Sequence, residues 1–234
     1  MKKIILMSAL AIVSSQAQST VVNLYDLNFE STVQPYGINF GSPTIEAAGL
    51  DGNSLVFNAN TSTYEQIELG MGYGFNQYNI SFDVLTNGLV GSDYNFALNV
   101  DTPQVQNLNL HGSVGLSTFN PGESAPADGG IFGSFVDNQR MRVDINVDIA
   151  NSLWTVDVDN GAFYSGPFYA SGSDITSLRF GLSPWIGGAV LDPNVSVALD
   201  NVVVTASVVP VPAAVWLFVS GLLGLLGFSS RKRL

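Results

Sequence analysis

Side chains that commonly carry out enzyme chemistry are scarce in this sequence. There is no cysteine, and His111 is the only histidine among the 234 residues. A zinc site needs several imidazole, thiolate or carboxylate ligands. A serine hydrolase needs a histidine beside its nucleophile, which often sits on a Gly-x-Ser-x-Gly turn, and this motif does not occur here. We therefore interpret His111 as a structural residue and predict no catalytic residues.

Carboxylates are abundant, and two of them on one face could serve as the acid and base of a glycosidase. Asp144 and Asp148 share a predicted strand face, as do Asp157 and Asp159, because alternate side chains of a strand point the same way. All four alternate with apolar residues, so we expect their faces to be solvated. We interpret them as ordinary exposed acids.

Two other features could bind a ligand without catalysis. Carboxylate, amide and carbonyl oxygens, the ligands that calcium prefers, are frequent in the chain. Trp185 lies in the loop-like segment Ser183–Ser196, and an exposed indole offers a flat apolar surface on which a sugar ring can stack. Trp185 is therefore a candidate glycan-stacking residue, with packing inside the loop as the alternative.

The charge of the chain is unevenly distributed. It contains 8 basic and 19 acidic residues, and five of the basic ones lie at the two extreme ends. Between the ends, only Arg140, Arg142 and Arg179 oppose all the acidic residues. Such a surface repels nucleic acid and anionic lipid. It suits an exported protein whose acidity keeps it soluble, or one that collects cations.

Strict alternation of apolar and polar residues predicts β-strands in the middle of the chain. No segment between the ends shows a helical period, and the many short strands indicate two packed antiparallel sheets. Trp154 alternates with valines and should be buried. Candidate strands lie near residues 20–29, 44–48, 53–58, 64–69, 77–86, 93–101, 105–110, 113–118, 131–137, 141–149, 152–159, 175–183 and 195–205.

Local details refine this expectation. Residues 141–159 predict a hairpin whose turn is centred on Ala150-Asn151. In the last strand the apolar positions change from odd to even numbers at Asp200-Asn201, which indicates a β-bulge. The segments Ser117–Gly133 and Ser183–Ser196 resist assignment to strands and are expected to be long loops.

Four short pieces carry a resemblance to concanavalin-A-like (laminin-G-like) jelly rolls. They are Leu27-Asn28-Phe29-Glu30, Gly52 to Phe57, Leu153 to Gly161, and Leu199-Asp200-Asn201-Val202. The resemblance implies an all-β, two-sheet jelly-roll sandwich. It also implies a structural calcium where the first and last strands meet, near Glu30, Asp200 and Asn201.

The N-terminus has the features of a secretory signal peptide. Lys2 and Lys3 precede an apolar run from Ile4 to Val13, which is short for a membrane span. Ser15 and Ala17 supply the small residues that signal peptidase recognises, so we expect cleavage after Ala17.

The C-terminus has the features of a sorting segment. The motif Val209-Pro210-Val211-Pro212-Ala213 leads into an uncharged apolar run that approaches the length of a membrane helix. Three basic residues then keep the end cytoplasmic; they are Arg231, Lys232 and Arg233. This order resembles the PEP-CTERM sorting domain in its Val-Pro-x-Pro-Ala variant.

The PEP-CTERM resemblance implies a Gram-negative bacterium, processing by an exosortase, and an association with exopolysaccharide and biofilm matrix. We expect a signal peptide at residues 1–17, a β-sandwich at 18–207 and a sorting segment at 208–234 with a transmembrane helix at 213–229. The precursor would be anchored in the inner membrane by its tail. The mature protein, lacking Ala213–Leu234, would reach the cell surface or the extracellular matrix.

Three functions remain open. The sequence favours a non-enzymatic surface or matrix protein, processed by signal peptidase and exosortase, that contacts exopolysaccharide. The alternative is a lectin-like carbohydrate-binding module. A secreted glycan hydrolase or lyase is the least favoured.

Overall fold

The computed structural model describes residues 20–30, 43–59, 65–71, 74–101, 107–119, 126–168, 175–184 and 191–208. The chain divides into two units, and Val21–Val208 forms one of them. Both terminal segments and Trp185 lie outside the described residues. Within the described part, the structure contains no helix long and apolar enough to cross a membrane.

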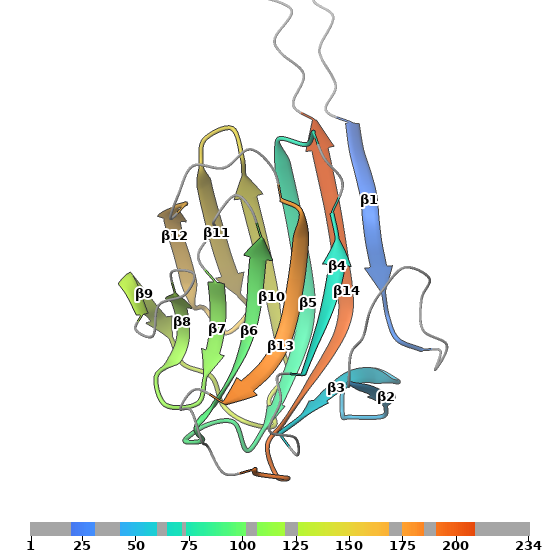
Figure 1. Cartoon of the computed structure of the whole chain (residues 1–234), viewed down its shortest axis with the longest axis vertical. Coiled ribbons are helices and arrows are strands. Elements are labelled where there is room, and N and C mark those ends of the chain that lie inside the picture. Colours follow the sequence, from blue (N-terminus) through green and yellow to red (C-terminus); the bar gives the residue numbers. More distant parts are fainter. Residues whose placement is uncertain are drawn as a thin grey trace, which may run out of the picture. The chain divides into compact units, whose positions relative to one another are not determined.

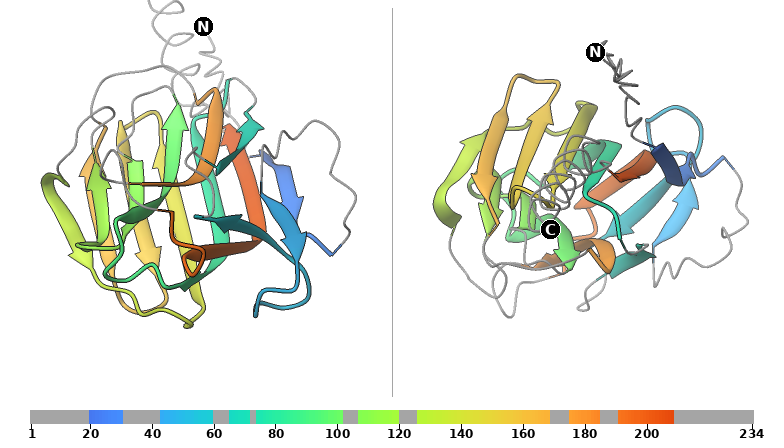
Figure 2. Two further views of the ribbon diagram at one scale, coloured as in Figure 1. Left: turned by 60° about the horizontal axis from the view of Figure 1, so that its bottom comes forward. Right: turned by 90° about the horizontal axis from the view of Figure 1, so that it is seen from above.

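The described residues form strands arranged in two sheets, which lie face to face (Figure 1 and Figure 2). Sheet A has eight strands in the order β12-β11-β10-β5-β14-β3-β2, with β1 also paired to β14. Its strands are β1 (Thr20–Leu27), β2 (Thr44–Glu46), β3 (Ser54–Asn58), β5 (Gln77–Asn87), β10 (Met141–Asp148), β11 (Leu153–Val158), β12 (Phe163–Pro167) and β14 (Ser196–Val208).

Sheet B has six strands in the order β4-β13-β6-β7-β8-β9. Its neighbouring strands pair antiparallel. The strands of sheet A from β12 to β2 do so as well. The strands of sheet B are β4 (Glu65–Gly70), β6 (Tyr94–Asp101), β7 (Asn107–His111), β8 (Gly115–Phe119), β9 (Pro126–Gly133) and β13 (Ser177–Pro184).

The apolar sides of the two sheets bury a continuous core between them. Phe82 of sheet A meets Phe180 of sheet B edge to face, with ring centroids 5.1 Å apart. Phe57 meets Phe96 in the same way at 5.2 Å. Each fully buried side chain of this size stabilises the fold by about 1.5–3 kcal/mol. The predicted all-β class with two packed antiparallel sheets is confirmed, as is the burial of Trp154.

Two local predictions are also confirmed. Strands β10 and β11 form the expected hairpin, with Asp148 opposite Leu153. The register of β14 against β5 shifts between Asp200 and Val203, where the predicted bulge lies. Asn201 adopts a left-handed backbone with φ of 49° at this bulge. The bulge interrupts the alternation because one extra residue is inserted without a partner.

Two expectations about loops are wrong. The segment Ser117–Gly133 contains the end of β8 and all of β9. The segment around Tyr164, which lies outside the predicted strands, forms the edge strand β12, and Tyr164 packs against Trp154 with ring centroids 5.3 Å apart. Both β9 and β12 end their sheets, so among the described strands each pairs with a single neighbour and can tolerate glycine and proline.

Candidate functional site

The outer surface of sheet A carries a polar face across five neighbouring strands. Paired residues of adjacent antiparallel strands project from the same side of a sheet. The register therefore places Thr205, Asn79, Asn146, Thr155 and Ser165 in one row that runs across β14, β5, β10, β11 and β12. Within this row the Asn146 amide donates to Asn79 Oδ1 at 2.8 Å. Amide and hydroxyl groups thus line a path perpendicular to the strands.

A shallow groove of about 200 Å³ lies on this polar face. The next row contributes Ser81, Asp144 and Asp157, which are register partners on β5, β10 and β11. Phe163 follows Asp157 in the register on β12, and its side chain is 57 % exposed. The groove therefore offers hydrogen-bond donors and acceptors beside an exposed aromatic ring. The side chains that line the groove are Asn79, Ser81, Asp144, Asn146, Thr155 and Asp157.

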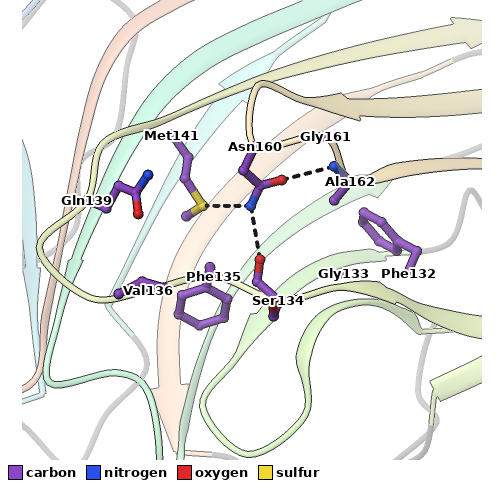
Figure 3. A pocket seen from close by; sticks show the side chains of 10 residues that line it. All are labelled: Phe132, Gly133, Ser134, Phe135, Val136, Gln139, Met141, Asn160, Gly161 and Ala162. Atoms are coloured by element: carbon purple, nitrogen blue, oxygen red, sulfur yellow. Dashed lines mark hydrogen bonds between the residues drawn. The ribbon is translucent and has the colours of Figure 1, made fainter.

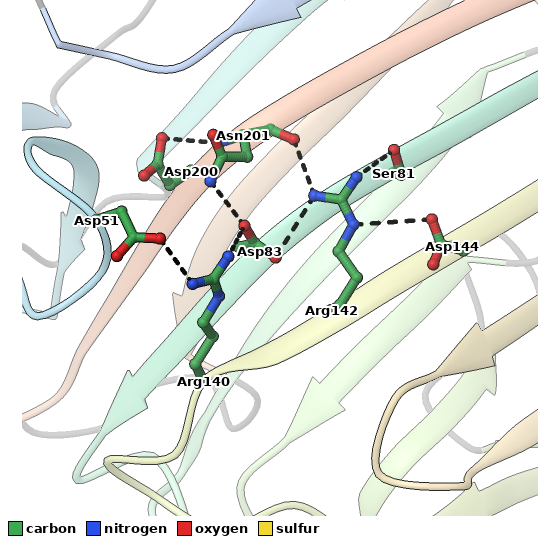
Figure 4. Close-up of polar contacts among 8 residues, drawn as sticks. All are labelled: Asp51, Ser81, Asp83, Arg140, Arg142, Asp144, Asp200 and Asn201. Carbon is green, nitrogen blue, oxygen red and sulfur yellow. Dashed lines mark hydrogen bonds and ion pairs between the residues drawn. The ribbon is translucent and has the colours of Figure 1, made fainter.

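At one end of the polar face, the buried carboxylate of Asp83 organises two arginines (Figure 4). Asp83 is only 1 % exposed. Its Oδ2 accepts hydrogen bonds from Arg140 Nη2 and from Asn201 Nδ2, both at 2.7 Å. Arg142 Nη1 lies 3.4 Å from Oδ1 and forms an ion pair with it. The hydrogen bond to Asp83 is the largest cause of the raised pKa of Arg140.

The same two arginines connect segments that are distant in the sequence. Arg140 Nη1 pairs with exposed Asp51 at 2.9 Å. Arg142 Nη2 donates to Ser81 Oγ at 2.7 Å, and its Nη1 donates to the carbonyl oxygen of Asn201 at 3.3 Å. These contacts hold strand β5, strand β10 and the bulge of β14 together. The sequence did not predict that the residues making these contacts would lie together.

Asp200 occupies an unusual position beside this cluster. It is 1 % exposed, and its Oδ1 accepts the backbone N–H of Asn201 at 2.7 Å. Its Oδ2 has no hydrogen-bond partner among the described residues. Burial raises the pKa of Asp200 to about 6, and the nearby charges of Asp83 and Glu30 act in the same direction. A carboxylate in this position would be stabilised by a proton or by a cation.

The three residues predicted for calcium are therefore only partly brought together. Glu30 and Asp200 are close enough for their charges to interact. The side-chain amide of Asn201 instead faces Asp83. Among the described residues, no three acidic or histidine side chains are arranged as a metal site. The oxygen donors of Glu30 and Asp200 fit the chemistry of calcium, and calcium binding stays a prediction.

The remaining candidate residues have different outcomes. Trp185, Ser15, Ala17 and the residues of the sorting motif lie outside the described part of the chain. His111 is 2 % exposed, its Nδ1 accepts the backbone N–H of Ser113 at 3.1 Å, and its ring stacks on Phe119. Burial lowers the pKa of His111, which favours the neutral ring.

No protein-family profile and no curated protein matches the chain. Solved structures with the same fold do match. The carbohydrate recognition domain of Emp47p has a TM-score of 0.53 and 16 % identity, over 81 % of this chain and 97 % of that domain. A botulinum neurotoxin DC binding domain, solved in complex with SialylT, has a TM-score of 0.54 and 10 % identity, over 78 % and 47 %.

A sialidase matches with a TM-score of 0.54 and 14 % identity, over 77 % of this chain and 18 % of the sialidase. The chain therefore spans less than half the length of the toxin and sialidase chains, and nearly all of the Emp47p domain. At these identities the similarity shows the fold. The chain is a two-sheet sandwich with the same fold as the matching parts of these structures.

Proposed function

We propose that this chain is a carbohydrate-binding protein, exported through its N-terminal signal peptide and sorted by its C-terminal segment. The observation that carries the proposal is the grooved polar face of sheet A. It lies on a sandwich that resembles a carbohydrate recognition domain along nearly the full length of that domain. A structure of botulinum neurotoxin type C, to which the chain is similar over 47 % of that structure, is described by cell entry that depends on interaction with two ganglioside molecules.

The chemistry of the polar face suits a polyhydroxylated ligand. Row members Asn79, Asn146 and Thr155 present both donors and acceptors, which is what sugar hydroxyls require. Adjacent strands lie about 4.8 Å apart, so a row across five strands extends about 19 Å. This length accommodates a short stretch of a polysaccharide chain. The excess of acidic residues favours neutral glycans over polyanionic ones.

The two ends of the chain supply the proposed context. A signal peptide and an exosortase-type tail would bring the domain to the cell surface or into the extracellular matrix. Exopolysaccharide is the glycan that such a protein would meet there. The proposed role is therefore non-enzymatic retention of, or attachment to, matrix polysaccharide.

The proposal is tested by affinity electrophoresis of the full-length chain in gels that contain neutral polysaccharides. We expect retardation of the wild type, and a loss of most of it in Asn146→Ala and Thr155→Ala. Thr44→Ala is the matched control, because Thr44 is exposed on β2 of the same sheet, away from the groove. Trp185→Ala tests separately whether the predicted stacking residue contributes. Equal mobility of the wild type with and without every polysaccharide would refute the function.

A glycan hydrolase is a second candidate because of one observation. Asp144 and Asp157 are register partners, and both are exposed in the groove. Two facing carboxylates are the groups that a glycosidase uses. Release of reducing ends from a neutral polysaccharide, abolished in Asp157→Asn, would support this candidate. Binding without any such release would exclude it for that polysaccharide.

A further inference from the structure

A second concave feature has no lining residue in common with the groove on sheet A. A pocket of about 380 Å³ opens between the segment that follows β9 and the turn that joins β11 to β12 (Figure 3). This volume falls within the range of about 300–1,000 Å³ that is typical of small-ligand sites. Met141 and Phe135 are buried and give the pocket apolar side chains, and the partly exposed ring of Phe132 also lines it.

Asn160 fixes the shape of this pocket. Its Oδ1 accepts the backbone N–H of Ala162 at 3.0 Å, and its Nδ2 donates to the carbonyl oxygen of Ser134 at 2.9 Å. The first bond closes the turn between β11 and β12. The second ties this turn to the segment after β9. Because both polar ends of the amide are engaged, Asn160 holds the turn and the segment after β9 together at one side of the pocket.

The polar groups that stay accessible lie elsewhere in the pocket. Gln139 lines it, is exposed, and makes no side-chain hydrogen bond within the described structure. Gly161 has a φ of 91°, and a Cβ built on it would meet nothing within 4 Å. Because Gly161 has no side chain, this turn does not obstruct the entrance of the pocket. The amide of Gln139 is thus one donor and acceptor available to a bound molecule, and the exposed Ser134 also lines the pocket.

The absence of charge from this pocket separates it from the rest of the surface. None of the described residues that line it is acidic or basic. The chain as a whole has a net charge of −11. An uncharged pocket on an acidic protein cannot compensate the charge of an anionic ligand, and it holds no carboxylate for a cation. Its apolar walls and its single free amide match a neutral ligand with one apolar face and several hydroxyl groups.

We propose that this pocket binds one neutral pyranose unit of a glycan. The apolar C–H face of the sugar would lie against Phe132 and the buried side chains, and a hydroxyl group would bond to Gln139. The inference rests on the proposed function and deepens it by adding a second, pocket-type site and a ligand class. It commits to uncharged sugars, and uronic acids would be bound less well.

The test is isothermal titration of the full-length chain in a detergent without a sugar headgroup. The probes are cellobiose, mannobiose, N,N′-diacetylchitobiose and, as the charged comparison, cellobiuronic acid. We expect at least one neutral disaccharide to bind, and the uronic acid to bind more weakly than cellobiose. Gln139→Ala should weaken binding about threefold to tenfold, the loss of one hydrogen bond. Val136→Trp, at a 62 % exposed position of the rim, should weaken it more than about tenfold by filling the mouth.

The matched control is Val90→Trp, because Val90 is also an exposed valine, at 49 %, and lies outside the residues that line the pocket. Val90→Trp should bind as the wild type does, and thermal midpoints close to the wild type would show that all variants fold. Wild-type affinity in Val136→Trp would overturn the pocket inference, as would the absence of binding by any neutral probe. Retardation in polysaccharide gels that persists in either case would leave the proposed function standing. Sugar binding in the pocket without retardation in the gels would refute the proposed function and support the pocket inference.

Discussion

Replacing Asp200 by asparagine should stabilise the protein at neutral pH and leave its stability unchanged in acid. Burial raises the pKa of Asp200 from 3.8 to about 6. The native carboxyl group therefore keeps its proton up to about pH 6, whereas the unfolded one loses it near pH 4. Between these values the native state binds more protons, so the free energy of unfolding falls as the pH rises. Each unit of the shift corresponds to about 1.4 kcal/mol. The total loss by pH 7.5 is then about 3 kcal/mol.

Asparagine is neutral at every pH, and its Oδ1 can still accept the N–H of Asn201. We expect Asp200→Asn to exceed the wild type by about 3 kcal/mol at pH 7.5 and by less than about 1 kcal/mol at pH 4. The measurement is urea unfolding across this range in the presence of a chelator. Asp144→Asn is the control, because it makes the same replacement at an exposed position. The Asp144 side chain is 63 % exposed and lies 3.8 Å from Arg142. A difference between Asp200→Asn and the wild type that does not change with pH would refute the reasoning.

Three further predictions concern the polar cluster, the metal and the tail. Asp83→Asn removes a buried charge from between two arginines, whose side chains are 46 % and 32 % exposed and can turn to solvent. We therefore expect the free energy of unfolding in urea to fall by about 1–3 kcal/mol. A fall below about 0.5 kcal/mol would contradict the role assigned to Asp83. Calcium should raise the thermal midpoint relative to a chelator, and Glu30→Gln should abolish the rise. Equal midpoints in calcium and chelator would count against the metal site. Protein from the native host should have an intact mass that lacks Ala213–Leu234, and a retained tail would make that segment a plain anchor.

Much of the strand content could be predicted from the sequence because alternation is a local property. In β10 and β11 the side chains on the buried face are methionine, valine, isoleucine or tryptophan, and those on the other face are polar except Leu153, so each strand encodes its own orientation. The bulge at Asp200-Asn201 was predictable for the same reason, since an inserted residue shifts the phase of the pattern. The expected signal peptide and sorting segment likewise depend on the order of residues along the chain.

The edge strands β9 and β12 were harder to predict because they lack that pattern. Strand β9 reads Pro-Ala-Asp-Gly-Gly-Ile-Phe-Gly, and β12 contains glycine and proline at its end. An edge strand donates and accepts backbone hydrogen bonds on one side only, so residues that would disrupt a central strand are tolerated there. What makes these segments strands is the neighbour that each one pairs with.

The candidate sites were decided by strand order and register, which no local pattern contains. Asp83 and Arg140 are 57 residues apart in the chain, and Asp83 and Asn201 are 118 apart, yet all three meet because β5 lies between β10 and β14. The row that includes Asn79, Asn146 and Thr155 exists for the same reason. The sequence by itself determined which side chains of a strand share a face. Only the tertiary structure decided which strands are neighbours. The reason is that strands distant in the sequence pair in the arrangement that buries the apolar sides of both sheets against each other.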